Sequence, residues 1–94
     1  MEFDIGDFVN VLTRQKVKND IRKKAIKRRK ELKISQKELA KRSSVSYGSI
    51  RRFEKDGEIS LSSLLAIGEI LNSLDDFEKL FSTPMITNLK DFKV

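Results

Sequence analysis

Two helix-start signals lie only eleven residues apart in this chain, at Ser35 and Ser46. Serine favours such positions because its hydroxyl accepts a hydrogen bond from an amide of the first helical turn. Glu38 completes a capping-box pattern, in which the serine and the glutamate each satisfy one amide. The first helix should then end near Arg42, and a turn of three or four residues leads into a second helix over residues 47–55. Two short helices joined this tightly leave few folds open.

The rest of the sequence also favours helices. Glycine occurs four times and proline once, and good helix formers dominate. Ser60 and Ser73 mark the starts of two later helices, over about residues 61–71 and 74–81. An earlier helix over residues 17–32 is predicted by apolar residues at helical spacing, namely Val17, Ile21, Ala25 and Leu32. We therefore expect an all-α domain of five helices. Its core should draw on Leu39, Ala40, Val45, Ile50, Phe53, Leu61, Leu64, Leu65 and Leu71.

The composition narrows the possible functions. The chain has no cysteine, which excludes disulfides and thiolate metal sites, and no histidine, the commonest general base. We expect neither an enzyme nor a bound metal or cofactor. No apolar run is long enough to span a membrane, and the acidic start does not resemble a signal peptide. These features lead us to expect a cytoplasmic protein.

Charge is divided unevenly along the chain. Residues 14–33 carry eleven lysines and arginines against two acids, a net charge of +9, and residues 34–55 add +4. Residues 56–94 have a net charge of −4. A basic surface of this kind is expected where a protein meets a polyanion, although a lysine-rich helix can also simply face solvent.

Two capped helices joined by a short turn form the helix-turn-helix pattern. In this motif the second helix enters the major groove of DNA, which is wide enough to admit one helix. Such a helix needs only a narrow apolar stripe to hold it on its scaffold, here Val45, Ile50 and Phe53. Its other residues are polar because they face DNA.

The same residues carry a family resemblance. Ser35-Gln36-Lys37-Glu38-Leu39-Ala40, followed by Val45-Ser46, Ile50 and Glu54, resemble the XRE family of lambda-repressor-like DNA-binding domains. The resemblance covers about residues 22–81. Within it, GSIRRFEKDGEISLSSLLAIGEIL resembles the DNA-binding antitoxins that are paired with HipA-type kinase toxins. We expect a five-helix lambda-repressor-like domain over residues 16–82. Residues 1–15 should form an N-terminal arm or extra helix, and residues 83–94 a C-terminal tail.

The resemblance implies roles for individual residues. It places Gln36 against the DNA backbone, and it pairs Arg29 with Glu54 to tie the first helix of the domain to the recognition helix. Which of Arg51 and Arg52 reads a base stays open, and Tyr47 could instead be a partly buried core aromatic. The residues expected to contact DNA are Ser35, Gln36, Ser46, Tyr47, Gly48, Ser49, Arg51, Arg52 and Lys55.

Three positions depart from the family pattern, one of them Gly57, which follows the recognition helix one or two positions late. Ser44 stands where the family commonly has glycine in the turn, so a left-handed backbone there would cost free energy. Arg28 stands where many relatives are apolar, so it should point outward or extend its charge to the surface.

The expected function is a sequence-specific, double-stranded DNA-binding transcriptional regulator, acting as a repressor and associated with the nucleoid. A homodimer on a palindromic operator is expected because two-fold pairing doubles the length of the site. The alternative is an antitoxin that restrains a HipA-type toxin and autoregulates its operon, and a third reading is a non-specific nucleic-acid binder. The terminal helix and tail carry more apolar residues than one small domain covers. The expected dimer or partner interface comprises Leu74, Phe77, Phe81, Ile86, Leu89 and Phe92.

Overall fold

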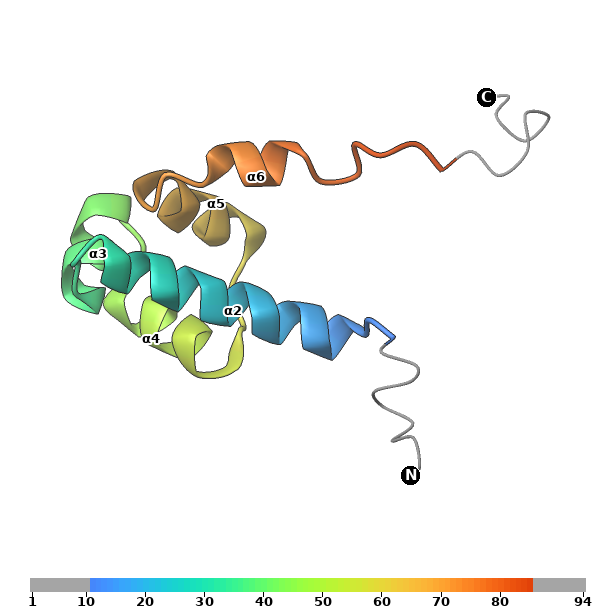
Figure 1. Cartoon of the computed structure of the whole chain (residues 1–94). Coiled ribbons are helices and arrows are strands. Elements are labelled where there is room, and N and C mark those ends of the chain that lie inside the picture. Colours follow the sequence, from blue (N-terminus) through green and yellow to red (C-terminus); the bar gives the residue numbers. More distant parts are fainter. Residues whose placement is uncertain (1–10, 86–94) are drawn as a thin grey trace.

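The computed structural model describes residues 11–85, which form five α-helices and no strand (Figure 1). The helices are α2 (Arg14–Glu31), α3 (Gln36–Ser43), α4 (Tyr47–Asp56), α5 (Leu61–Ile70) and α6 (Leu74–Glu78). None of these helices is long and apolar enough to cross a membrane. The expected all-α, five-helix fold is confirmed. The expected interface residues Ile86, Leu89 and Phe92, and the first ten residues of the expected N-terminal arm, lie outside the described range.

Side-chain caps determine where four of the helices begin. The hydroxyls of Ser35, Ser46 and Ser60 each accept a hydrogen bond from the amide three residues later, as the sequence predicted. Thr13 does the same for the amide of Lys16, at 3.0 Å. Helix α2 therefore begins three residues earlier than its apolar spacing indicated, because the cap and not the first apolar residue sets its start.

Two of the expected caps are wrong. Glu38 does not return to the amide of Ser35, because its carboxylate accepts a hydrogen bond from Arg42 Nε at 2.7 Å. Ser73 caps nothing with its side chain; its hydroxyl donates to the carbonyl of Leu71 at 3.1 Å and accepts a hydrogen bond from Arg28 Nη1 at 3.2 Å. Helix α6 is also shorter than expected and ends at Glu78.

Each of the five helices is followed by a residue with a left-handed backbone. These residues have φ between 59° and 82° and are Lys33, Ser44, Gly57, Asn72 and Phe81. Only α4 uses glycine for this purpose, although glycine adopts such a backbone at the lowest cost. Ser44, at φ 63°, is therefore a strained residue in the turn between α3 and α4.

The buried core joins α3, α4 and α5. It consists of Leu39, Val45, Ile50, Phe53, Ile67 and Leu71. Ala40 and Leu64 pack against this cluster as expected. Leu61 was expected in the core but is 66% exposed, because it directly follows the cap of α5 and faces solvent there.

Helix α2 joins this core mainly through polar contacts. None of its residues is buried, and Val17 and Ile21 are about 40% exposed, so the apolar stripe predicted for this helix is only partly used. Arg22 Nη1 instead donates to the carbonyl of Glu54 at 2.7 Å. Arg28, which was expected to point outward or to extend its charge to the surface, is half-buried and donates to the carbonyl of Leu71 at 3.0 Å, which satisfies a carbonyl at the end of α5.

We predict that Ser44→Gly raises the free energy of unfolding by about 0.5–1 kcal/mol, because glycine adopts a left-handed backbone without steric cost. The matched control is Ser62→Gly, the same chemical change at an exposed position inside α5, which should lower it by about 0.5 kcal/mol. Urea denaturation of the two variants and the parent measures both free energies of unfolding. A Ser44→Gly variant less stable than the parent would show that the hydroxyl matters more than the backbone.

Candidate nucleic-acid interface

A buried ion pair lies behind α4. Arg29 Nε donates to Glu54 Oε2 at 2.7 Å and Arg29 Nη2 donates to Glu54 Oε1 at 3.0 Å. The two side chains are only 11% and 8% exposed. Arg29 Nη1 also donates to the carbonyl of Ile34 at 2.9 Å. The structure thus brings together the two residues that the sequence analysis paired, and it does so in bidentate geometry.

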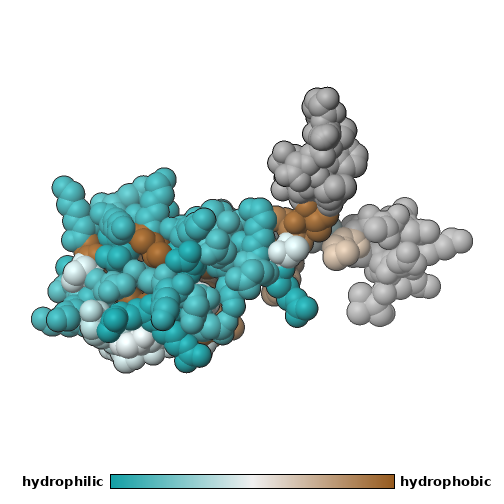
Figure 2. Space-filling model, turned by 90° about the horizontal axis from the view of Figure 1, so that it is seen from below, coloured by the Kyte–Doolittle hydropathy of each residue, from teal (hydrophilic) through white to brown (hydrophobic). Residues whose placement is uncertain are grey.

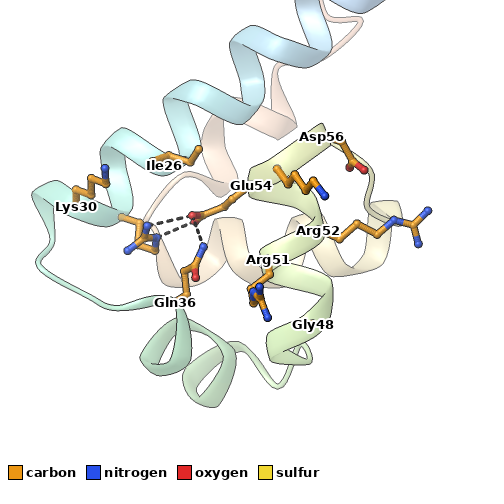
Figure 3. Close-up of a pocket in the computed structure, with 10 residues that line it drawn as sticks. Ile26, Lys30, Gln36, Gly48, Arg51, Arg52, Glu54 and Asp56 are labelled. Carbon is orange, nitrogen blue, oxygen red and sulfur yellow. Dashed lines mark hydrogen bonds and ion pairs between the residues drawn. The ribbon is translucent and has the colours of Figure 1, made fainter.

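Gln36 joins this network from the first position of α3. Its Nε2 donates to Glu54 Oε1 at 2.8 Å, as the dashed lines in Figure 3 show. The amide group of Gln36 is therefore engaged within the protein. The contact between Gln36 and the DNA backbone remains a prediction. In this conformation, the groups that could make it are the side-chain oxygen of Gln36 and the free backbone amides in the first turn of α3.

The outer face of α4 is polar and cationic. Tyr47, Gly48, Arg51, Arg52 and Lys55 recur at the spacing of one helical face, and all five are exposed. The buried Ile50 and Phe53 occupy the opposite side of the helix. Within residues 11–85, no side-chain hydrogen bond or ion pair holds the two arginines or the lysine. These side chains are therefore available to a ligand.

The three serines of the expected interface serve first as structural groups. The hydroxyls of Ser35 and Ser46 cap α3 and α4. Ser46 Oγ also donates to Ser49 Oγ at 2.8 Å. Contacts between these hydroxyls and DNA remain a prediction.

An open groove lies between the second half of α2, the start of α3 and α4 (Figure 3). Its lining includes four cationic side chains besides Arg29, namely Lys30, Arg51, Arg52 and Lys55. Its acids are Glu54, which Arg29 neutralises, and Asp56, which accepts a hydrogen bond from the amide of Glu58. The view from below α4 in Figure 2 shows a mainly hydrophilic surface. The groove is thus built to attract an anion.

Tyr47 lies beside two cations. Lys37 Nζ is 5.6 Å and Arg51 Cζ is 5.5 Å from the centre of its ring, within the range of cation–π attraction. Tyr47 is 37% exposed and is neither part of the buried core cluster nor packed against it. Lys37 was not among the residues selected from the sequence. It lies on α3, and no pattern within a single helix indicates a contact with Tyr47 on α4.

The acids near this surface are held in place. The hydrogen bond from Arg42 lowers the pKa of Glu38 below its ordinary value, so this carboxylate stays ionised and neutralises Arg42. Among the described residues, no three aspartate, glutamate, cysteine or histidine side chains cluster where they could hold a metal ion.

The described residues that were expected at a dimer or partner interface differ in how exposed they are. Phe81 is fully exposed and Leu74 is 44% exposed. Phe77 is half-buried against Gly68, where an added Cβ would lie 2.7 Å from its ring, so this phenylalanine mainly packs α6 onto α5. Leu80 and Met85 are also exposed, at 58% and 90%. Phe81 follows the end of α6 and does not share a helical face with Leu74.

Comparison with known proteins gives one match. A family model described as helix-turn-helix matches residues 26–77, which is more than half of the chain. The matched range begins in α2, contains α3, α4 and α5, and ends in α6. No curated protein and no solved structure matches the chain.

We predict that Glu54→Ala lowers the free energy of unfolding by about 3–5 kcal/mol, because it leaves Arg29 buried without its partner. Chemical denaturation measures this loss, which is a large part of the total stability of a small domain. The matched control is Glu58→Ala, which removes the exposed partner of Lys18 and should cost less than about 1 kcal/mol. Equal losses in the two variants would contradict the importance given to the buried pair.

Proposed function

The chain belongs to the helix-turn-helix family, and on that premise we propose that it is a transcriptional repressor that acts as a homodimer on a palindromic operator. A DNA-binding transcriptional regulator is the function that this family indicates. The observation that carries the proposal is the division of α4 into two faces. Its rear face buries Ile50 and Phe53 in the core and pairs Glu54 with Arg29 of α2, and its outer face presents Arg51, Arg52 and Lys55.

The dimensions of α4 support insertion into the major groove. An α-helix with its side chains is about 10–12 Å in diameter, and the major groove is about 12 Å wide. Gly48 lies on the outer face near the start of the helix, and nothing lies within 4 Å of where its Cβ would be. The absence of a side chain there lets the backbone approach DNA closely. Lysine and arginine side chains around the groove then supply contacts to phosphates.

Two further features support a homodimer. One helix-turn-helix reads only a few base pairs, so a second copy is needed for a site of useful length. The end of the described chain also exposes a group of large apolar side chains, Leu74, Leu80, Phe81 and Met85. Phe81 combines full exposure with a left-handed backbone, which is uncommon for a bulky residue. An apolar group of this kind is expected where a partner binds, and we propose that a second copy covers it.

The antitoxin is the second candidate function. It is favoured by the acidic exposed residues of α6, Asp75, Asp76 and Glu78, which lie beside the same apolar group and contrast with the basic face of α4. An antitoxin would use this surface for a HipA-type kinase toxin and the outer face of α4 for its own operator. The test is co-expression with a kinase-like product of an adjacent gene. Growth arrest that this chain relieves would favour the antitoxin.

We predict that operator affinity falls on the order of a thousandfold between roughly 50 and 200 mM salt, because phosphate contacts release counterions. Lys55→Gln should reduce the slope of log affinity against log salt by about one per protomer. The matched control is Lys79→Gln, which removes a lysine at the end of α6 and should leave the slope unchanged. Selection from random DNA should yield a palindrome with half-sites about one helical turn apart. A flat salt titration together with no selected sequence would overturn the proposed function.

We predict that Phe81→Asp converts the dimer into a monomer in sedimentation experiments and weakens operator binding, because the charge cannot be buried at an apolar interface. Helical content should not change, since Phe81 is fully exposed and outside α6. The matched control is Leu32→Asp, which changes an exposed apolar residue at the end of α2. The protein with this substitution should remain dimeric. A Phe81→Asp variant that stays dimeric would place the interface elsewhere.

A further inference from the structure

The two arginines of α4 have different surroundings. Arg51 lies next to the ring of Tyr47, with Cζ 5.5 Å from the ring centre. Arg52 also lines the first groove, but it extends to a second groove that leads to the start of α5, where Ser60 and Ser63 line it. Figure 3 shows the two guanidinium groups leaving α4 in different directions. The two side chains are therefore placed to meet different parts of a bound duplex.

We propose that Arg51 reads a guanine in each half-site, that Tyr47 is the positioning residue that orients Arg51, and that Arg52 contacts a phosphate. This inference rests on the proposed function and deepens it, because it names one base of the DNA sequence that the protein recognises. It also separates the roles of two neighbouring arginines that the sequence leaves equivalent.

The chemistry of the guanidinium group supports this division. An arginine beside an aromatic ring uses the face of its guanidinium, which leaves the N–H groups at its edge free. Those N–H groups form the planar fork that matches O6 and N7 of guanine in the major groove. The ring also restricts the rotamers of Arg51, so less conformational freedom is lost when the fork binds. No comparable neighbour orients Arg52 within the described residues.

Lys37 adds a second positive charge beside Tyr47, which favours the binding of an anion there. Its ammonium lies 5.6 Å from the centre of the same ring, so the ring has two cations as neighbours. Two like charges near one side chain repel each other, and a bound polyanion reduces that repulsion. Lys37 lies at the start of α3 and Arg51 lies on α4, so Tyr47 also links the two helices of the motif.

Binding-site selection and salt titration test the proposal with the full chain. Arg51→Ala should lose preference for guanine at one position of each half-site, by about 5- to 150-fold per half-site. Arg51→Lys keeps the charge but not the planar fork, so it should weaken the same preference and keep the salt dependence. Arg52→Ala should weaken binding to all sequences alike and lower the salt slope by about one per protomer.

Tyr47 is tested by two substitutions. Tyr47→Leu removes the ring and should reduce the guanine preference by about two- to fivefold without changing the salt slope. Tyr47→Phe keeps the ring and should keep the preference. The proposal is overturned if guanine preference depends on Arg52 and not on Arg51, if the base that depends on Arg51 is not guanine, or if Tyr47→Leu weakens all sequences equally. A parent protein with no preferred sequence would instead overturn the proposed function, and this inference with it.

Discussion

The arrangement of the domain depends on the carboxylate of Glu54. This carboxylate accepts two hydrogen bonds from Arg29 on α2 and one from Gln36 on α3. The backbone carbonyl of Glu54 accepts a further hydrogen bond from Arg22 on α2. One residue of α4 therefore holds both neighbouring helices. Because α2 has no buried residue, apolar packing alone does not determine how it lies against α4. A buried ion pair contributes little net stability compared with an apolar core, but it requires one geometry and so specifies one arrangement.

This arrangement has an electrostatic consequence for the proposed interface. A free carboxylate at the base of a groove meant for DNA would repel phosphates. Arg29 neutralises Glu54 at that point, so the remaining charges of the groove are four cations and one acid, namely Lys30, Arg51, Arg52, Lys55 and Asp56, and the field there is positive. The same pair thus positions α4 and keeps the groove attractive to an anion. The position of α4 and the charge of the groove both depend on the contact between Arg29 and Glu54. A substitution of Glu54 is therefore expected to affect stability and DNA binding together.

Helix starts could be predicted from the sequence because an N-cap is a local interaction. Ser35 and Ser46 each act on an amide three residues away, so their effect does not depend on the rest of the fold. Four helix ends were also predicted to within one residue, and α6 is the exception, because Phe81, inside the predicted helix, adopts a left-handed backbone that is typical of glycine or asparagine. The apolar spacing of α2 was misleading for a different reason. Periodicity indicates which residues share a face, but it does not show that a neighbour covers that face.

The candidate site illustrates where prediction from sequence stops. The exposed face of α4 could be derived from the burial of Ile50 and Phe53, and the pairing of Arg29 with Glu54 came from the family resemblance. The contact between Lys37 and Tyr47 could not be derived, because it depends on the angle at which α3 crosses α4. The turn between the two helices contains the left-handed Ser44 and the buried Val45, and the backbone path of such a turn constrains that angle. The turn therefore does more than connect two helices. By constraining the angle between α3 and α4, it brings Lys37 to the ring of Tyr47, which also faces Arg51. The backbone of Ser44 is thereby connected to the proposed reading of a base by Arg51.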